Sequence, residues 1–488
     1  MELPLRPTLN SVTTIRGDGS RRFLYPADVS GRFARLRRIS AAGLILVYLS
    51  LPWIPVNGYP AVFLDVVERR FHLFGFTLAA QDLWLLFFLI TGLGFGLFFI
   101  TAALGRIWCG WACPQTVFLD HVFRRVERWI DGDPIRRRAL ADAPWGFNKV
   151  VRRVLKHGLY VLFAALIAHL FLSYFVSLPA VWQMILAAPG EHWGAFVFMV
   201  AATGMIYFNF AWFREQLCIV ICPYGRLQSA LIDDNSLIIG YDARRGEPRG
   251  FRPAVPGANL AAGLAEERFG DCVNCTRCVQ VCPTGIDIRN GVQMECIGCS
   301  ACVDACDDIM AKLHRPKGLI RYDSMVGLAG GKTRWLRPRM ALYGVLCLAG
   351  MSVALWAFST VRPANVEVTR MVGAPFVIDP GFIRNQFLVR IVNKRNEPAH
   401  FFVRIGPISP EVHQVGGTDR VDVPALGEVV LPLIVEEDRT AYRGPFELTV
   451  TVYGDAYLTL PKRAEFLGPD PLFLSLVAAP SPAPGPAK

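Results

Sequence analysis

Long apolar runs alternate with arginine-rich segments along the first 360 residues of the chain. Five runs approach the roughly 20 apolar residues that a helix needs to cross a bilayer core of about 30 Å. They are residues 39–56, 83–104, 158–178, 194–213 and 340–360. The first is the shortest and contains Pro52. This pattern predicts a bundle of five transmembrane helices.

After residue 360 the pattern changes to short runs rich in β-branched and aromatic residues. "QFLVRIVNK", "HFFVRI", "GEVVLPLIV" and "FELTVTVYGD" are separated by proline, glycine and asparagine, which is typical of strands joined by turns. Residues 361–470 are therefore predicted to form a small β-sandwich. Residues 471–488 end in "PSPAPGPAK", and this composition predicts disorder.

Composition and charge fit a polytopic membrane protein. The chain has 488 residues, is 53% hydrophobic and has a mean hydropathy of +0.35, which is more apolar than ordinary soluble proteins. Residues 1–38 contain no apolar signal segment, so the first run is expected to act as the insertion signal.

Lysine and arginine are distributed unevenly between the segments that flank the runs. Residues 1–38, 105–157 and 214–339 hold 8, 11 and 17 of them, whereas 57–82 and 179–193 hold 2 and 0. The positive-inside rule makes the first three segments cytoplasmic and the tail after residue 360 external. The net charge of +11 reflects this topology, and nucleic-acid binding is not needed to explain it.

The most specific motif is a pair of cysteine runs, "CVNCTRCVQVCP" and "CIGCSACVDAC". Both have the C-x2-C-x2-C-x3-C spacing of bacterial ferredoxins, in which the fourth cysteine of each run ligates the other cluster. The predicted ligands of the two [4Fe–4S] clusters are Cys272, Cys275, Cys278 and Cys306 for one, and Cys282, Cys296, Cys299 and Cys302 for the second. Two zinc sites are the alternative. Asp307 stands where a proline usually follows the last cysteine.

A second cysteine motif occurs twice. The run 83–104 is followed by "RIWCGWACPQ", and the run 194–213 by "EQLCIVICPY". The two copies form an internal repeat of membrane hairpins. The pairs Cys109 with Cys113 and Cys218 with Cys222 are therefore expected at the same membrane face, where they can meet. Cys347 lies alone in the fifth run and is predicted to be a packing residue.

The spacing within each pair favours metal binding. Cysteines four apart on one helix have Cβ atoms roughly 5–6 Å apart, whereas a disulfide needs about 3.8 Å. The prolines that follow, Pro114 and Pro223, either interrupt a continuing helix or end it at the preceding cysteine. In both cases the thiols are expected at the carboxyl end of a span, where the helix dipole disfavours thiolates and favours cations.

Thiolates select soft ions such as Cu(I) and also suit zinc. Copper changes valence by one electron, so it is favoured beside one-electron carriers. The alternative is that the four cysteines are small packing residues at helix ends.

Together these motifs resemble the FixG/RdxA/CcoG family, the membrane iron–sulfur accessory proteins of cbb3-type cytochrome c oxidase assembly. The resemblance covers nearly the whole chain. It rests on "YPADVSGRFARLRR", "CGWACPQTVF", "CIVICPYGRLQS", the two ferredoxin runs and the β-rich segment after the fifth run. It implies an immunoglobulin-like fold for that segment. It also implies a cupric reductase that converts Cu(II) to Cu(I) on the cytoplasmic side, with copper held at Cys109, Cys113, Cys218 and Cys222.

The expected fold is a membrane α-helical bundle with an inserted cytoplasmic 2[4Fe–4S] ferredoxin-like domain and a C-terminal all-β immunoglobulin-like domain. The expected domains are a cytoplasmic segment (1–38), four membrane helices with both thiol motifs (39–216), the ferredoxin domain (217–339), a fifth membrane helix (340–360), a periplasmic sandwich (361–470) and a disordered tail (471–488).

The resemblance implies a location in the bacterial inner membrane. It implies two [4Fe–4S] clusters as cofactors and copper as substrate or bound ion. The implied partners are a cytoplasmic electron donor, a copper transporter or chaperone and assembly factors of the cbb3-type oxidase, and a homodimer is a further possibility.

Two other functions compete with copper reduction. A quinol-oxidising membrane ferredoxin, of the kind that accompanies periplasmic nitrate reduction, needs a quinone pocket; Trp108 and Trp111 either line it or anchor the interface. A non-catalytic redox-sensing scaffold would bind an assembly partner through its outer domain. Haem is disfavoured, because only His169 lies well inside a run. His121 is either an auxiliary copper ligand or an exposed loop residue.

Overall fold

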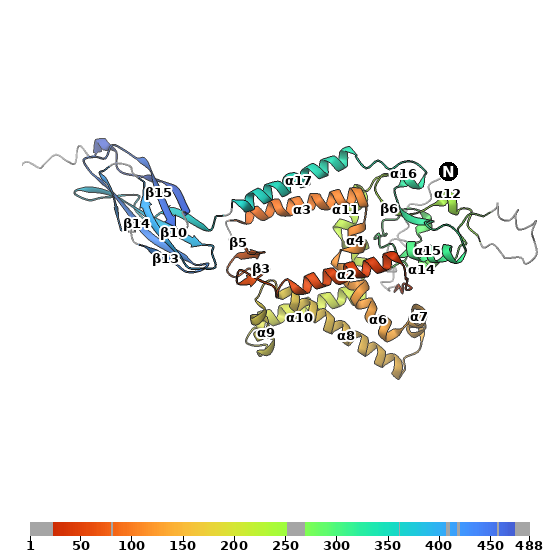
Figure 1. Cartoon of the computed structure of the whole chain (residues 1–488). Coiled ribbons are helices and arrows are strands. Elements are labelled where there is room, and N and C mark those ends of the chain that lie inside the picture. The colour runs from red at the N-terminus through yellow and green to blue at the C-terminus, as the bar shows by residue number, and fades with distance from the viewer. Residues whose placement is uncertain are drawn as a thin grey trace, which may run out of the picture. The chain divides into compact units, whose positions relative to one another are not determined.

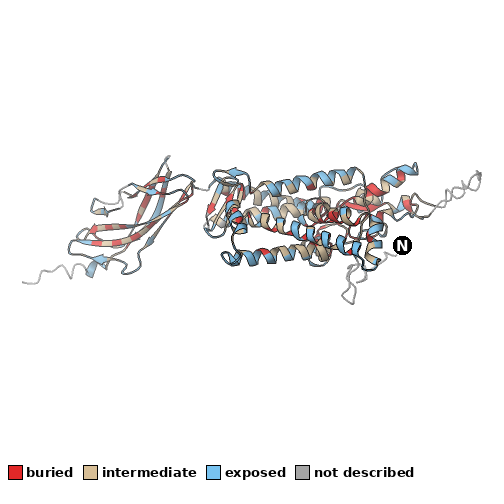
Figure 2. Cartoon of the chain, turned by 90° about the horizontal axis from the view of Figure 1, so that it is seen from below, coloured by how far each residue is buried: buried red, intermediate tan, exposed pale blue. Residues whose placement is uncertain are grey.

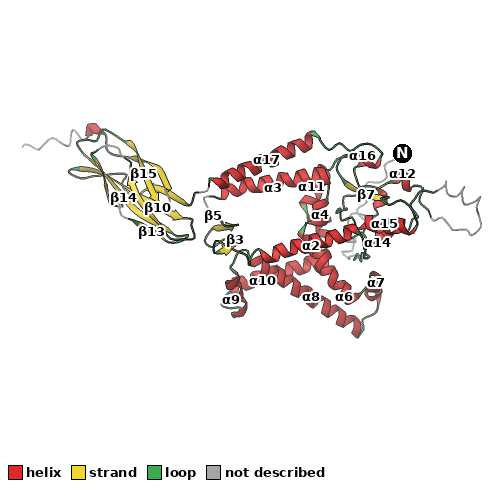
Figure 3. Ribbon diagram, in the orientation of Figure 1, coloured by secondary structure: helices red, strands yellow, loops and turns green. Residues whose placement is uncertain are grey.

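The helical and the β-rich parts of the chain form separate units. The computed structural model describes residues 23–79, 82–250, 269–360, 362–406, 410–416, 420–455 and 458–473. The first unit holds the described residues up to 55, 60–66 and 84–356, and the second holds 56–59, 67–83 and those from 357 on. Helices dominate the first and strands the second (Figure 3). Most of the predicted disordered tail and of the N-terminal segment 1–38 lies outside the described residues.

Among the described residues, four helices are long and apolar enough to cross a membrane. They are α3 Leu83–Leu104, α8 Phe147–Leu172, α10 Trp193–Phe208 with the π-helical turn η3 Asn209–Phe213, and α17 Pro338–Ser359. Only 11–22% of their most apolar windows is buried in the protein, and Figure 2 shows their pale, exposed faces. Exposed apolar surface of this extent marks a membrane interaction.

The first predicted span is not among these four helices. Residues 39–56 are split between the helix α2, Arg32–Ser50, and a turn that contains Pro52. The apolar part of α2 from Ile39 to Ser50 rises about 18 Å, less than the about 30 Å of a bilayer core. A fifth span therefore remains a prediction.

The third predicted span, 158–178, has different boundaries in the structure. Helix α8 begins at Phe147 and ends at Leu172, because basic residues in its first turns do not prevent a helix. Pro179 lies in the first turn of a separate helix, α9 Leu178–Leu186, since proline is tolerated there and not in a helix interior.

Helices α3 and α17 run side by side (Figure 1) and approach closely at two glycines. A Cβ on Gly350 would lie 2.8 Å from the Cα of Gly92. Small residues allow this approach in membrane helix pairs. Cys347 belongs to the same contact, because its Sγ lies 3.2 Å from where a Cβ on Gly96 would be. This position fits the packing role predicted for Cys347.

Short elements connect these helices. Before α3 lie β1 Pro55–Val56, β2 Tyr59–Pro60, β3 Val62–Asp65, β4 Arg70–Leu73 and β5 Phe76–Ala79, of which β4 and β5 pair antiparallel. Between α3 and α8 lie α4 Ile107–Trp111, α5 Pro114–Phe118, the π-helical turn η2 Leu119–Phe123, α6 Arg124–Asp131 and α7 Pro134–Asp142. After α10 lie the π-helical turn η4 Leu217–Ile221 and α11 Pro223–Leu231.

A two-stranded sheet joins the two ends of the cysteine-rich segment. Strand β6 Ile238–Tyr241 pairs antiparallel with β7 Ile320–Asp323. Between and after them lie α12 Ala243–Gly246, α14 Arg277–Gln280, the 3-10 turn η5 Ile288–Asn290, α15 Ala301–Lys312 and α16 Met325–Leu328. Helix α2 is tied to this segment, because the backbone N–H groups of Phe33 and Ala34 donate to the carboxylate of Asp304 on α15, at 3.2 and 2.7 Å.

The second unit contains two antiparallel sheets. One has the order β12-β14-β10-β8, with β9 paired to β10, and the other has the order β13-β11-β15-β16. Their strands are β8 Ala364–Arg370, β9 Val377–Ile378, β10 Phe382–Asn393, β11 Ala399–Ile405, β12 Val412–Val415, β13 Val421–Val423, β14 Glu428–Asp438, β15 Phe446–Gly454 and β16 Leu458–Phe466. Buried residues alternate along β10, as expected when one face of a sheet packs on the core.

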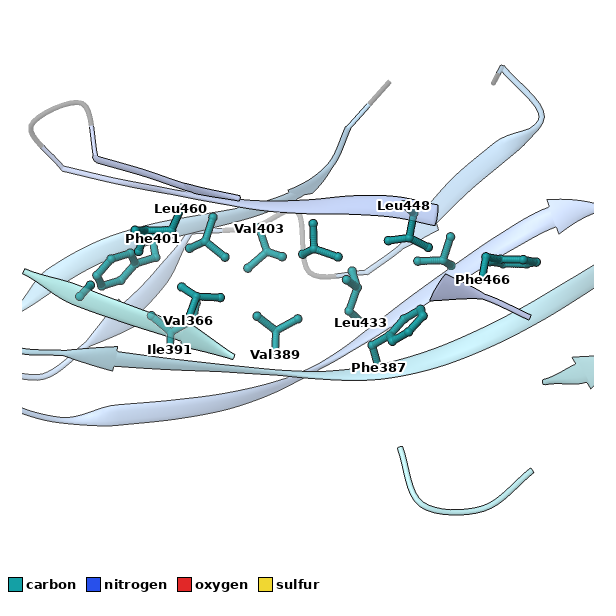
Figure 4. Close-up of a cluster of buried hydrophobic side chains, with 14 of the residues drawn as sticks. Val366, Phe387, Val389, Ile391, Phe401, Val403, Leu433, Leu448, Leu460 and Phe466 are labelled. Carbon is teal, nitrogen blue, oxygen red and sulfur yellow. The ribbon is translucent and has the colours of Figure 1, made fainter. Parts of the chain in front are cut away.

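Side chains of the two sheets meet in one apolar core (Figure 4). Val389 and Ile391 on β10 point toward Phe401 and Val403 on β11 (Figure 4), and all four are at most 1% exposed. The four runs quoted from the sequence coincide with β10, β11, β14 and β15. The predicted β-sandwich is present.

Candidate iron–sulfur and thiol site

The first predicted group of cluster ligands converges in the structure. Cys272, Cys275 and Cys278 line one small cavity together with Cys306 from α15. Burial and the neighbouring thiols Cys278 and Cys272 raise the pKa of Cys306 to about 12. Four cysteines around one space are the donor set that a [4Fe–4S] cluster takes as thiolates, so these residues fit the group.

The second predicted group also lies together. Burial raises the pKa of Cys302 well above its ordinary value, and Cys299, Cys296 and Cys282 add to this effect at close range. The crossed assignment of the fourth cysteines stays a prediction, and this grouping supports it.

Among the described residues, no three histidine, cysteine, aspartate or glutamate side chains converge as ligands of a single metal ion, and this holds for the ferredoxin cysteines and for the four motif thiols alike. A structural zinc ion needs four ligands around one centre, with sulfur at about 2.3 Å. A cluster of several irons accepts thiols that are further apart.

The thiol motifs break the helices that were expected to carry them. Helix α3 ends at Leu104, and Cys109 lies on the separate five-residue helix α4. Cys113 has an extended backbone and is the N-cap of α5, whose first residue is Pro114. The second motif repeats this arrangement, with Cys218 in η4 and Cys222 as the N-cap of α11.

The expectation that both cysteines of a pair share one helical face at a carboxyl end is therefore wrong. Proline is favoured at the first position of a helix because its missing N–H has no partner there. Pro114 and Pro223 thus start new helices, and Cys113 and Cys222 lie at helix amino termini.

The two motifs nonetheless meet. Burial raises the pKa of Cys218 to about 12, and the thiols of Cys113, Cys109 and Cys222 contribute, so all four lie within electrostatic range of one another. Burial likewise raises the pKa of Cys109 to about 11, and its Sγ donates to Gln228 Oε1 on α11 at 3.4 Å. The four thiols are buried or half-buried.

The first motif packs directly against the loop of the second ferredoxin run. Cys109 and Cys299 belong to one apolar cluster with Ile297. A Cβ on Gly110 would lie 2.7 Å from the carbonyl oxygen of Ile297, and one on Gly298 would lie 2.9 Å from that of Arg106. Only glycine permits this approach of two backbones.

Polar contacts hold the same interface. The guanidinium of Arg106 donates to the carbonyls of Met294, Cys296 and Gly225, so it joins the ferredoxin loop to the start of α11. The indole N–H of Trp111 contacts the carbonyl of Gly298 at 3.3 Å and the hydroxyl of Tyr322 at 3.2 Å. No motif or spacing along the chain predicts that these residues contact one another.

A buried charge network links the segments beside the two motifs. Arg214, just before the second motif, donates through both Nη atoms to the carboxylate of Glu127 on α6, at 3.0 and 3.1 Å. Arg124 pairs with Asp120 and Glu215 at 2.5 and 3.2 Å. Burial alone would raise the pKa of Glu127, but Arg214 and neighbouring cations lower it to about 2.

The two histidines that were considered as ligands, His121 and His169, have other surroundings in the structure. His121 is half-buried within η2 among arginines, so it is not an exposed loop residue, and this cationic setting disfavours copper. His169 bonds to the carbonyl of Ala165 in its own helix at 2.8 Å, as expected for a residue of the bundle.

Models of three protein families match the chain. They describe a 4Fe-4S binding domain over residues 84–134, a 4Fe-4S dicluster domain over 213–325 and an Ig-like fold at the C-terminus of FixG over 354–469. The first match spans Cys109 and Cys113, and the second spans Cys218, Cys222 and all eight ferredoxin cysteines.

Three curated proteins are similar over most of their length. RdxA of Cereibacter sphaeroides is 36% identical over 82% of this chain and 86% of its own. The nitrogen fixation protein FixG of Rhizobium meliloti is 35% identical over 76% and 77%, and RdxB of Cereibacter sphaeroides is 34% identical over 78% and 81%. The chain belongs to the FixG/RdxA family.

This FixG/RdxA protein is accordingly a membrane-associated iron–sulfur electron-transfer protein with an Ig-like C-terminal domain. The family predicted from the sequence motifs is confirmed. A crystal structure of a FixG-related protein from Vibrio parahaemolyticus is similar over 22% of this FixG/RdxA chain and 97% of that chain, with 16% identity and a TM-score of 0.19.

Proposed function

We propose that this protein reduces Cu(II) to Cu(I) at the four motif thiols and supplies the reduced ion for assembly of a cbb3-type cytochrome oxidase. The observation that carries the proposal is the packing of Cys109 and Cys299 in one buried cluster. A soft-metal donor set thereby lies against a predicted iron–sulfur ligand. Thiolates select Cu(I), so the reduced product is the form that these residues hold best.

The reaction needs one electron for each copper ion. When bound, the two [4Fe–4S] clusters supply one-electron transfer, and a soluble reduced carrier of the cytoplasm is the proposed source of electrons. Copper binding at the thiols releases their protons to water, because the thiolate is the ligand. Arg106 keeps the second motif against the ferredoxin loop, and the indole N–H of Trp111 donates to the carbonyl of Gly298 in the same loop.

The same proposal assigns the membrane sides. The cysteine-rich segment and both thiol motifs face the cytoplasm, the Ig-like domain lies in the periplasm, and the domain boundaries are those expected from the sequence. The copper donor and the oxidase assembly factors are the proposed partners.

Copper reduction is tested with anaerobically purified, prereduced protein and a chelator that becomes coloured with Cu(I). Wild type is expected to form Cu(I), and Cys109→Ala/Cys218→Ala to lose this activity while keeping its cluster absorbance. Cys347→Ala is the matched control, since it removes a thiol from the α3–α17 contact. Wild type with intact clusters that leaves Cu(II) unreduced would falsify the proposal.

Metal analysis of the same samples separates copper from iron at these thiols. Two clusters bring about eight irons per chain. Iron well above this content that is lost in Cys109→Ala/Cys218→Ala would mean that the motif thiols hold iron. This control is necessary because the family model over residues 84–134 describes a 4Fe-4S binding domain.

A second candidate function is quinol oxidation, and one cavity favours it. Apolar side chains at the end of α3 and around β6 line this cavity together with Arg106, Asp234 and Cys296, a predicted cluster ligand. Its volume of about 280 Å³ is near the lower bound of the roughly 300–1,000 Å³ typical of ligand pockets. Trp108 and Trp111 do not line it.

A quinol gives up two electrons, one to each cluster, and two protons, of which Asp234 at the cavity would accept one and water the other. Val292→Trp narrows the cavity and distinguishes the two functions. Quinol oxidation predicts that this variant is no longer reduced by a soluble menaquinol analogue. Copper reduction predicts that the prereduced variant still forms Cu(I). Cluster-free variants that support oxidase assembly would instead indicate a scaffold.

A further inference from the structure

A cavity beside the second cysteine group is lined by an excess of arginine. It lies between the stretch that leads into α2, the segment from η2 to α7 and the ferredoxin loops near Pro283 and Ala301. Its charged lining consists of Arg37, Arg38, Arg124, Arg125, Arg128, Arg137, Asp28 and Asp120. Six guanidinium groups thus face two carboxylates.

Ion pairs neutralise four of these arginines. Asp120 pairs with Arg37 and Arg124 at 2.5 Å each, and Asp28 pairs with Arg128. From outside the lining, Glu127 contacts Arg137 at 3.5 Å and Glu215 contacts Arg124. Arg38 and Arg125 have no carboxylate partner among the described residues.

The lining also contains buried nitrogen atoms without partners. His121 Nε2, Arg124 Nε and Arg137 Nε have no hydrogen-bond partner among the described residues, and Arg124 and Arg137 are only 9% and 4% exposed. Burial, together with Arg37, Arg125 and Arg38, lowers the pKa of His121 to about 4 even though Asp120 opposes the shift. Within the described part of the chain, the guanidinium groups of Arg38 and Arg125 therefore remain without a neutralising carboxylate at the cavity wall after the ion pairs have formed.

Of the four predicted ligands of the second cluster, one lines the cavity. Cys299 lines it, whereas Cys282, Cys296 and Cys302 do not. Its volume of about 120 Å³ is below the roughly 300–1,000 Å³ of pockets for larger ligands. The space suits a small anionic group and is too small for a whole nucleotide.

We propose that this cavity binds the phosphate group of an anionic ligand, beside Cys299. Arginine is the side chain that best matches phosphate oxygens, because its planar fork donates two parallel hydrogen bonds. Arg38 directly precedes the apolar part of α2, so the headgroup of an anionic phospholipid is one source of that phosphate. Free phosphate is the other.

The test uses the full chain with both clusters, in detergent. Calorimetric titration with inorganic phosphate and native mass spectrometry with added phosphatidylglycerol form the two arms, with phosphatidylcholine as the lipid of zero net charge. Arg38→Gln/Arg125→Gln is expected to weaken binding about tenfold, the factor that a charge-assisted hydrogen bond supplies. Binding in only one arm identifies the source of the phosphate.

Arg35→Gln/Arg138→Gln is the matched control, because both arginines are exposed and lie outside the lining. It removes the same charge from α2 and α7 and is expected to bind as wild type does. Cluster absorbance verifies that each variant is folded. The proposal is overturned if wild type binds neither probe, if the cavity variant binds as tightly as wild type, or if the control weakens binding equally.

Discussion

Two glycines set the distance between the first thiol motif and the second ferredoxin run. At Gly110 and at Gly298, backbone atoms of the facing segment occupy the space that a Cβ would need. Gly298 also has a φ of +69°, which glycine adopts without steric cost. The sequence shows both glycines beside cysteines but gives no sign that they face each other, because this contact joins residues that are far apart along the chain.

We expect Gly110→Ala to separate the first thiol motif from the second ferredoxin run. Its Cβ would press on the carbonyls of Ile297 and Gly298 at 2.7 and 2.8 Å, and backbone atoms cannot rotate away. The loops must separate, at a cost of about 1–3 kcal/mol. Stopped-flow measurement of Cu(I) formation by prereduced protein should show a slower rate with unchanged iron content.

Gly94→Ala is the control, since nothing lies within 4 Å of its added Cβ. It should reduce copper at the rate of wild type. An undiminished rate in Gly110→Ala would show that this close approach is not needed.

A single carboxylate in the β-sandwich is expected to make its stability depend on pH. Burial and the nearby Glu411 raise the pKa of Glu437 from an ordinary 4.5 to about 7, and its Oε2 has no partner among the described residues. The folded state therefore holds this proton more tightly than the unfolded state. The contribution of Glu437 to stability is fully present below about pH 4.5 and is lost as pH rises through about 7.

Glu437→Gln should remove this dependence and stabilise the sandwich by about 1–3 kcal/mol at pH 8. The measurement is amide hydrogen exchange of β10 and β14 in the full chain, corrected for intrinsic rates at each pH. Glu447→Gln on β15 has 73% of its side chain exposed and should change little. Equal protection of wild type at pH 5.5 and 8 would contradict the expectation.

At the scale of elements, helix ends were harder to predict than helices. The long apolar runs identified α3, α8, α10 and α17 from the sequence, because length and hydropathy alone define such segments. The breaks at Cys113 and Cys222 were not resolved, since a proline after a cysteine is compatible with either a kinked or a new helix. The π-helical turns η3 and η4 left no signal in the pattern.

The buried pair of Arg214 and Glu127 connects the two hairpins, and we expect Arg214→Gln to weaken that connection strongly. It would leave the Glu127 carboxylate buried without its bidentate partner, which typically costs about 3–5 kcal/mol. Thermal unfolding of the detergent-solubilised protein should shift to a lower temperature.

Arg390→Gln serves as the control, because its pair with Glu428 is exposed and such pairs contribute about 0–1 kcal/mol. The double variant Glu127→Gln/Arg214→Gln should regain part of the loss, since no uncompensated charge remains. Equal shifts for Arg214→Gln and Arg390→Gln would mean that the pair is not a structural link.

At the scale of the whole molecule, the positive-inside rule predicts that the β-sandwich and the cysteine-rich segment lie on opposite sides of the membrane. A membrane-impermeant maleimide added to spheroplasts should label Glu447→Cys in the sandwich and leave Asp308→Cys on α15 unlabelled until the cells are lysed. Both positions have more than half of their side chain exposed, so access to the membrane side decides the outcome. The reverse labelling would invert the topology.

Local sequence patterns predicted more of the fold than of the site. Strand runs, apolar helices and ferredoxin spacings are short-range patterns, and they led to the family. The contact of Arg106 with Cys296 joins residues 190 positions apart, and that of Arg214 with Glu127 joins residues 87 positions apart, so no periodicity or short motif predicts them.

The pairing of β6 with β7 has one more consequence. The strands before and after the cysteine-rich segment lie next to each other, so the chain departs from the helical bundle and rejoins it at a single point. Such an insert can be gained or lost by one recombination event without rethreading its host.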